Sequence, residues 1–492
     1  MRITVRNLGV LREEATIDLK PLTIFIGPNN SGKTWLAYAL GGVLGPYGSR
    51  EYTQAYVEER VPTIYEPVNQ AVKQILAKGN ATIDLCKLAE DYGEMYFNEV
   101  AKLARSWINE FFSTQNAHFD SLDVSLNLAE NKEYFLQQIL HFSRRSTIAR
   151  DLLTIQKRRD DSKIYAYTVI EGEDAREEEE KIGEKIPSEL VKERLFGFVS
   201  TALHRSLYTG VCVFPTERTT FAASRFSERI ADREQLQNVA KLTEALNALV
   251  KELDITELPT PGVASGDVNG PVGSFLDMLR ASFKVGARAR EARRKNAESN
   301  YRIRQYLDLA DVLEKQILAG NIEFSTPEPD PNREVLFHPL PDVPLDMPVV
   351  SSMVKVLSPL VLFLRYLAQP GELLIIDEPE MNLHPEAQAK IIEFLAMLVN
   401  AGLRILITTH SPYLVDHLTN LIRAAEYKSD DQALIVDKFF LKHKDAFISQ
   451  DNLSVYLFNS GEVENILFEG GKINWGTFGD VSDRIANIHY EL

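Results

Sequence analysis

The sequence predicts an α/β fold in which a mixed sheet is flanked by helices and carries large helical insertions. Three observations predict it. A glycine-rich loop at residues 27–34 follows an apolar strand directly. Two further apolar strands, within residues 373–380 (LLIIDEPE) and 403–412 (LRILITTHSP), end in polar side chains. Segments with the 3.6-residue period of amphipathic helices separate these strands.

The loop at residues 27–34 reads GPNNSGKT, the complete G-x-x-x-x-G-K-[ST] pattern, and follows the strand LTIFI. Such a loop wraps a polyphosphate with its main-chain N–H groups, and Gly27 and Gly32 allow the close approach. Lys33 would bring a positive charge to the β- and γ-phosphates, and the Thr34 hydroxyl is a suitable ligand for Mg²⁺. The predicted nucleotide contacts are Gly27, Pro28, Asn29, Asn30, Ser31, Gly32, Lys33 and Thr34.

Along the chain, the pattern alternates between a strand-containing core and helical insertions. Residues 1–51 read as strand, turn, strand, phosphate loop and a helix from about Lys33. Residues 52–207 are mostly helical, with short strand-like pieces (LDVSLNL, KIYAYTVIEG) and an acidic run from Glu171 that we expect in a solvated loop or hairpin tip. Residues 208–225 hold a strand, and residues 226–320 form a second helical insertion. The core returns over residues 321–492.

The strand at residues 373–380 supplies the second half of the nucleotide site. A buried parallel strand delivers the side chains at its carboxyl end to the ligand edge of the sheet. Asp377 is then placed to hold Mg²⁺, and Glu378 is placed to orient and deprotonate an attacking water. His410 follows the next buried strand at the same edge, where it could reach the γ-phosphate or that water. Glu378 and His410 are therefore the predicted catalytic residues.

Net charge, cysteine content and apolar stretches limit the partners and the compartment that we expect for this chain. The 492 residues carry a formal net charge of −16, which repels polyanions as a whole and leaves only local patches for nucleic acid. Cys86 and Cys212 lie far apart and match no metal-finger spacing, so we expect a reducing cytoplasm. The most apolar stretch, residues 356–368, is interrupted by Arg365 and is too short to span a bilayer, so we expect no membrane contact.

One basic segment stands out from the acidic background. Residues 284–304 contain eight basic side chains and two acidic ones. They either contact a phosphate backbone or form a solvated helix face that pairs with acids. The basic residues are Lys284, Arg288, Arg290, Arg293, Arg294, Lys295, Arg302 and Arg304.

The segments GPNNSGKT, LLIIDEPEMNLHP and LITTHSP resemble the sequence motifs of the ATP-binding-cassette (ABC) class of ATPases. The likeness is to the heads of structural-maintenance-of-chromosomes (SMC) and Rad50-like proteins and to the overcoming-lysogenization-defect (OLD) family. It implies a P-loop ABC-type ATPase head made of residues 1–51, 208–225 and 321–492, with ATP and Mg²⁺ as ligands. Residues 27–34 would be Walker A, Asp377 Walker B, Glu378 the catalytic glutamate, residues 380–384 the D-loop region and His410 the switch histidine.

The resemblance also implies a signature helix that completes the site of a second copy, so a homodimer or higher homo-oligomer is expected. Ser351 and Ser352 precede a helix at the matching position, where they either capture the γ-phosphate of the partner copy or simply cap the helix. Met353 departs from the glycine that is frequent there. The segment Pro215-Thr216-Glu217-Arg218 is similar to a short P-A-x-R element of these ATPases, and Arg218 could contact phosphate, another subunit or an acid of this chain.

OLD-family proteins often carry a carboxyl-terminal Toprim nuclease with a D-x-D pair. The 72 residues after Asn420 contain no such pair, so we expect a separate effector. The leading hypothesis is an ATPase similar to the stand-alone subunits of anti-phage systems such as PARIS and Septu, which sense infection or hold an effector nuclease in check. Nucleic acid and a phage protein are further candidate partners. The alternatives are an SMC- or RecF-like DNA repair ATPase and a scaffold with a structural nucleotide.

Overall fold

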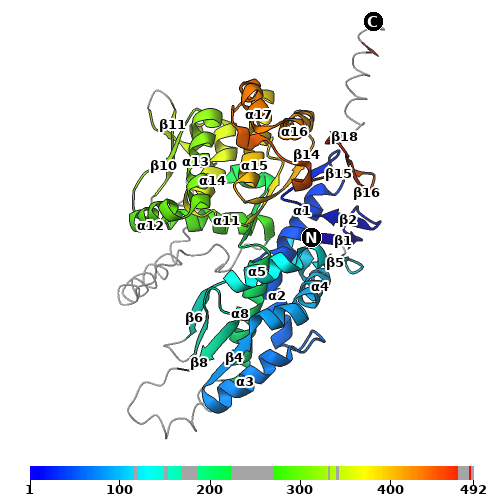
Figure 1. The fold of residues 1–492 in the computed structure, drawn as a ribbon, viewed down its shortest axis with the longest axis vertical. Helices are drawn as coiled ribbons and strands as arrows, with labels where there is room; N and C mark the ends of the chain where they lie inside the picture. Colours follow the sequence, from blue (N-terminus) through cyan, green and yellow to red (C-terminus); the bar gives the residue numbers. More distant parts are fainter. Residues whose placement is uncertain are drawn as a thin grey trace. The chain divides into compact units, whose positions relative to one another are not determined.

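The computed structural model describes residues 1–115, 119–148, 153–168, 187–222, 270–330, 333–339, 343–474 and 487–488. Two compact units are formed (Figure 1). Unit 1 contains Met1–Leu19, Tyr38–Val211 and Ser460–Val463, and unit 2 contains Lys20–Ala37, Cys212–Asn459 and Glu464–Leu492. The boundaries of these two units differ from the boundaries of the five segments expected from the sequence. The five segments remain a prediction.

Unit 2 is built on a six-stranded sheet of order β16-β15-β3-β14-β13-β9. Neighbouring strands run parallel from β15 through β3 and β14 to β13. The strands are β3 (Leu22–Ile26), β9 (Val211–Phe214), β13 (Leu373–Asp377), β14 (Arg404–Thr409), β15 (Leu453–Asn459) and β16 (Glu462–Asn465).

The central strands form because their sequences are apolar throughout. Every residue of β3 and β13 is buried, which suits parallel strands that are covered on both faces. Ile26, Ile376 and Ile407 belong to one hydrophobic core with residues of the surrounding helices. The α/β class with a P-loop head, as predicted, is confirmed.

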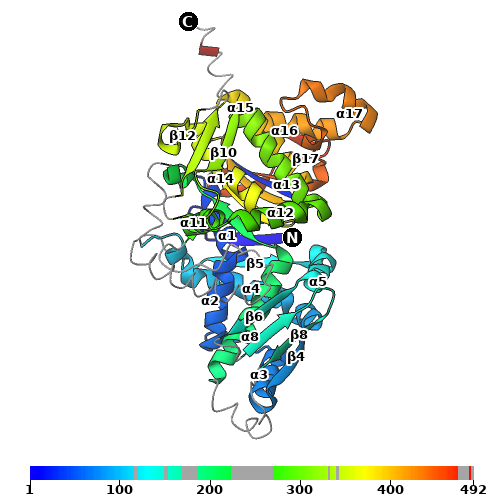
Figure 2. The ribbon, with the colours of Figure 1, turned by 90° about the vertical axis from the view of Figure 1, so that its left-hand side faces the viewer.

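Helices and a small second sheet complete unit 2. α12 packs against α13, and α13 packs against α14 (Figure 2). β10, β11 and β12 form an antiparallel sheet. Unit 2 includes the start of α1, a helix that spans Lys33–Leu44 as a whole. The other helices are α11 (Gly270–Phe283), α12 (Ala287–Ser299), α13 (Tyr301–Val312), the π-helix η4 (Leu313–Leu318), α14 (Ser352–Tyr366), α15 (Pro385–Asn400), α16 (Pro412–Ala425) and α17 (Ser429–Ile435). The remaining strands are β10 (Gly320–Phe324), β11 (Val335–Pro339), β12 (Leu345–Asp346), β17 (Leu467–Phe468) and β18 (Lys472–Ile473).

Part of the second helical insertion packs into this same core. Phe275 of α11 and Ile303 of α13 are buried in the cluster that contains the strand residues. Within the basic segment, Arg293 is only 3% exposed and donates to the carbonyl oxygens of Leu364, Arg365 and Ala368, at the end of α14. Arg302 likewise donates to the Asn400 carbonyl at the end of α15. These two arginines cap helices, because a helix leaves its last carbonyls unpaired.

Unit 1 combines two antiparallel sheets with five α-helices among the described residues, besides the rest of α1. The sheet β2-β1-β5 and the sheet β4-β8-β7-β6 include the strand-like pieces expected around residues 123 and 164. The strands are β1 (Arg2–Arg6), β2 (Ala15–Asp18), β4 (Asn80–Asp84), β5 (Asp123–Asn127), β6 (Arg144–Ile148), β7 (Leu153–Lys157) and β8 (Lys163–Tyr167). The helices are α2 (Pro46–Val57), α3 (Glu66–Lys78), α4 (Leu85–Phe111), α5 (Lys132–His141) and α8 (Ser188–Leu207).

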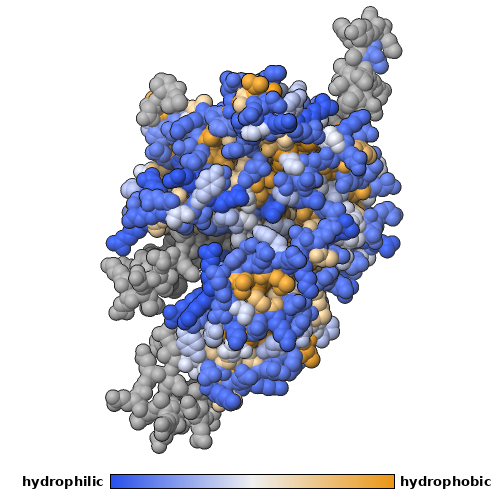
Figure 3. All heavy atoms as spheres, in the orientation of Figure 1, coloured by the Kyte–Doolittle hydropathy of each residue, from blue (hydrophilic) through white to orange (hydrophobic). Residues whose placement is uncertain are grey.

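Further observations concern the surface, the membrane-spanning potential of the helices, the cysteines and the acidic run. The face in Figure 3 is mainly hydrophilic, with apolar residues gathered in smaller areas. None of the described helices has the length and apolar character that crossing a membrane requires. Cys86 and Cys212 are both free thiols. The acidic run from Glu171 falls outside the described residues.

Candidate functional site

The candidate nucleotide site lies in unit 2, where the carboxyl ends of three parallel strands meet. Asp377 at the end of β13 is in register with Thr408 of β14, and Thr409 is in register with Ile26 of β3. The phosphate loop follows Ile26, and His410 follows Thr409. The structure therefore brings together the loop, the acidic pair and the histidine that the sequence predicts for one site.

The phosphate loop has the backbone that its glycines permit. Gly27 has φ +149° and Gly32 has φ +100°, values that side chains rarely adopt. A Cβ at Gly27 would lie 2.2 Å from the carbonyl oxygen of Phe458 in β15. Gly27 is therefore required by the neighbouring strand, a reason that the sequence pattern does not reveal.

The outer part of the loop is open to solvent, whereas its lysine is enclosed. Pro28, Asn29 and Asn30 are exposed, and Ser31 and Lys33 are buried. The Lys33 Nζ atom donates to the carbonyl oxygens of Gly27 at 2.8 Å and Pro28 at 2.7 Å. Burial lowers the pKa of Lys33, while the nearby carboxylates of Glu378, Asp377 and Glu380 oppose that shift. The amine is held in the loop, within the field of the acidic residues.

Thr34 and Asp377 form a pair of hard oxygen ligands. Thr34 Oγ1 donates to Asp377 Oδ1 at 3.0 Å, and Thr408 Oγ1 donates to the same oxygen. The part of the chain that the structure describes holds no cluster of three or more His, Cys, Asp or Glu residues that could bind a metal by itself. Mg²⁺ commonly takes only one or two protein oxygens and completes its shell with water and substrate phosphates, so these two residues fit it.

Glu378 and His410 face each other at the same edge. His410 Nδ1 lies 3.2 Å from Glu378 Oε1, and the two side chains are 43% and 25% exposed. The carboxylate raises the pKa of His410, and the imidazole lowers the pKa of Glu378. Each group thus favours the charged form of the other, which keeps Glu378 ionised and able to accept a proton.

Glu380 orients the segment that carries His410. Its Oε1 accepts from Thr409 Oγ1 at 2.5 Å and from the His410 N–H at 3.0 Å. The side chain is 4% exposed, and burial raises its pKa. Sequence reasoning placed Glu380 only in the D-loop region and missed Thr408. The signal for both is the register of β13 with β14, which puts the Thr-Thr pair of LITTHSP beside the acids.

The serines expected at the partner's nucleotide lie at the start of α14. Ser351 is the N-cap, and its Oγ accepts from the Val354 N–H at 3.4 Å. Ser351 and Ser352 are both exposed. Their contact with the nucleotide of a second copy remains a prediction.

Two of three comparisons relate the chain to known proteins. Residues 1–415 match the model of the AAA ATPase domain family. No curated protein matches the sequence.

Solved structures of SMC heads resemble the chain at low identity. The SMC head with an extended coiled coil bound to the C-terminal domain of ScpA, from Pyrococcus furiosus, is 10% identical over 99% of this chain and 98% of that chain, with a TM-score of 0.34. The SMC head domain from Thermotoga maritima is 10% identical over 95% and 98%, with a TM-score of 0.29.

The match over residues 1–415 covers far more than half of the 492 residues, and it includes the phosphate loop, the acidic strand and His410. The chain therefore belongs to the AAA ATPase domain family and is an ATPase of the P-loop α/β class.

Proposed function

We propose that the chain hydrolyses ATP at the edge formed by β3, β13 and β14, with Lys33, Glu378 and His410 in the roles that their positions suggest. One observation carries this proposal: the loop lysine lies in the field of Glu378, and Glu378 lies 3.2 Å from His410. Residues separated by almost 350 positions thus share one small volume. Such convergence is expected of phosphoryl transfer, in which positioning and electrostatics supply most of the catalysis.

The chemistry follows from the charges. Glu378 would orient a water and accept its proton as the water oxygen bonds to the γ-phosphorus and the bond to ADP breaks. The imidazole of His410 would hold the carboxylate and face the γ-phosphate. Thr34 and Asp377 would hold Mg²⁺, which, when bound, neutralises charge on the phosphate oxygens. Lys33 would exchange its bonds to the loop carbonyls for bonds to phosphate.

A second copy of the chain is part of the proposal. Ser351 and Ser352 stand exposed at a helix start, where free N–H groups favour an anion. ATP would then be enclosed between the site of one copy and the α14 start of another. Hydrolysis would release or reset this assembly.

At the level of biology, we infer a sensor or regulator subunit of an anti-phage defence complex that works with a separate effector such as a nuclease in the cytoplasm. The alternative is an SMC- or RecF-like DNA repair ATPase. That alternative needs a basic surface for DNA, and Arg293 and Arg302 of the basic segment are engaged as helix caps. Two of the eight basic side chains are therefore engaged within the chain, which counts against a DNA surface on this segment.

The test compares wild type with Glu378→Gln, purified with the products of neighbouring genes. The proposal expects ATP to shift Glu378→Gln from monomer to dimer or larger on size exclusion with light scattering. It also expects a separate effector to co-purify, and weak duplex DNA binding. Tight DNA binding without any partner would favour the repair alternative. An oligomer unaffected by ATP would contradict the shared site.

A further inference from the structure

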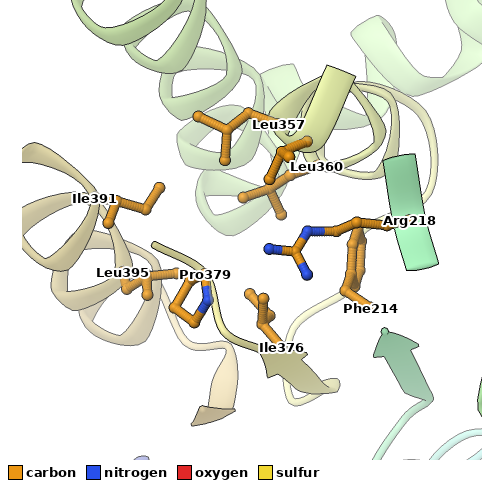
Figure 4. A pocket seen from close by; sticks show the side chains of 9 residues that line it. Phe214, Arg218, Leu357, Leu360, Ile376, Pro379, Ile391 and Leu395 are labelled. Atoms are coloured by element: carbon orange, nitrogen blue, oxygen red, sulfur yellow. The ribbon is translucent and has the colours of Figure 1, made fainter. Parts of the chain in front are cut away.

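Arg218 is a buried charge beside the catalytic strand. It lies in the 3-10 helix η3 (Thr216–Ala222) directly after β9, and it is 1% exposed. Figure 4 shows its guanidinium directed toward Ile376 and Pro379, in a pocket whose other side chains, including Leu357 and Ile391, are apolar. An apolar residue could fill such a pocket without the desolvation that a guanidinium suffers. The buried guanidinium must therefore make interactions that offset its desolvation.

The guanidinium holds the main chain that carries the acidic pair. Arg218 Nη1 donates to the carbonyl oxygen of Asp377 at 2.6 Å and to that of Pro215 at 2.9 Å. Arg218 Nη2 donates to the carbonyl oxygen of Glu378 at 2.6 Å. The planar fork of an arginine suits two neighbouring carbonyls in this way, and the shorter point charge of a lysine does not. Two successive peptide groups are thereby fixed to η3, the helix that follows β9.

Glu378 has the backbone conformation that most needs such support. Its φ is +46°, in the left-handed region that residues with a Cβ avoid. From the other side, its N–H donates to Oγ1 and the carbonyl oxygen of Thr408, at 3.1 Å each. Strained residues persist where the surroundings over-determine them, and they concentrate at functional sites. Arg218 and Thr408 hold the strained residue between η3 and β14.

We propose that Arg218 is a positioning residue for ATP hydrolysis, which fixes the left-handed turn after β13 so that the Glu378 carboxylate faces His410. This inference rests on the proposed role of Glu378. Arg218 does not touch the nucleotide in this account, so it acts on the rate of the chemical step and not on ATP affinity. A misplacement of about 1 Å can reduce a rate about 100-fold, which gives the contact its importance.

The experiment uses Arg218→Met, which keeps the length and removes the charge, and Arg218→Lys, which keeps the charge and loses the fork. The matched control is Arg293→Met, because Arg293 is also buried on three carbonyl oxygens in unit 2 but lies at the far end of α14. We expect kcat to fall roughly 10- to 100-fold in Arg218→Met and at least about 5-fold in Arg218→Lys. ATP affinity should stay within about 3-fold, and Arg293→Met should lower the melting temperature while keeping kcat per folded molecule.

A double-variant cycle separates positioning from general damage. If Arg218 acts through Glu378, Arg218→Met adds almost no loss to Glu378→Gln in single-turnover hydrolysis. Equal losses in both backgrounds, or wild-type kcat in Arg218→Lys, would overturn the proposal. If Arg218→Met does not fold, Arg218→Lys decides by the same cycle. A wild type that does not hydrolyse ATP, or Glu378→Gln as active as wild type, would instead refute the proposed function itself.

Discussion

His410 Nδ1 lies 3.2 Å from Oε1 of Glu378, and the two side chains stabilise each other's charged form. The contact joins the ends of two strands that the sequence separates by about 30 residues. It links the proposed base to the proposed γ-phosphate sensor through one close contact. Changes to one member should therefore alter the titration of the other.

Replacement of His410 by glutamine should lower turnover on the order of 100-fold. It should also shift the acid limb of the pH–rate profile to higher pH. His410 lowers the pKa of Glu378, so its loss lets that pKa rise toward the ordinary value for a glutamate. The rate would then fall at higher pH than in wild type as the solution is acidified. The measurement is kcat against pH. A profile that keeps its acid limb at the wild-type pH would contradict the coupling.

Replacement of Thr34 by valine keeps the shape of the side chain and removes the hydroxyl that contacts Asp377. We expect the Mg²⁺ concentration for half-maximal hydrolysis to rise about 10-fold or more, because the metal loses one protein oxygen. Thr419→Val is the control, since that hydroxyl bonds only within α16 at Val415. A Mg²⁺ titration measures both. Identical curves for wild type and Thr34→Val would exclude Thr34 as a ligand.

Alanine at Gly27 should destabilise unit 2 by on the order of 2 kcal/mol or more, because its Cβ would meet the Phe458 carbonyl oxygen at 2.2 Å. Gly470 is the matched control: it also has positive φ, +76°, but a Cβ there meets nothing within 4 Å. Gly470→Ala should cost only on the order of 1 kcal/mol. Urea unfolding midpoints compare them. Equal midpoints would show that φ alone, and not the contact with β15, matters at Gly27.

Unit 1 contains a histidine that should make stability depend on pH. His204 is buried, its Nε2 donates to the Val43 carbonyl oxygen at 3.3 Å, and its Nδ1 therefore accepts from the Tyr96 hydroxyl at 3.0 Å. Burial lowers the pKa of His204 from 6.5 to about 4. The unfolded chain takes up a proton below pH 6.5 and the folded chain does not, so stability is complete above that pH and is lost as the pH falls toward 4.

The loss should reach roughly 3 kcal/mol across this window. His204→Gln can keep both hydrogen bonds without titrating, so its unfolding free energy should vary less between pH 7 and pH 4.5 than that of wild type. Chemical unfolding at the two pH values measures the difference. A glutamine variant as sensitive to acid as wild type would place the effect elsewhere.

Local patterns predicted the elements of the site well. The loop pattern and the apolar run before it predicted β3, the turn and a helix from Lys33, since glycines, lysine and threonine there have fixed mechanical roles. The apolar run before Asp377 likewise predicted β13. Because parallel strands align their carboxyl ends, the meeting of Asp377, Glu378 and His410 with the loop followed from topology.

Contacts between distant main-chain and side-chain atoms were not predictable in this way. Arg218 reaches carbonyl oxygens 159 and 160 residues away, and no side-chain pattern marks a carbonyl acceptor. The charge count of residues 284–304 could not distinguish Arg293, which is buried in the core, from its exposed neighbours. The grouping of residues 1–19 with unit 1 depends on long-range packing, which the order of elements does not express.

The central claim is that Glu378 activates water for ATP hydrolysis at this site. Its most direct test is the steady-state rate of phosphate release by wild type and Glu378→Gln at saturating ATP and Mg²⁺, with ATP binding measured in parallel. The account predicts that Glu378→Gln binds ATP as tightly as wild type and loses activity on the order of 100-fold or more. Phosphate release at the wild-type rate by a fully folded Glu378→Gln would contradict it.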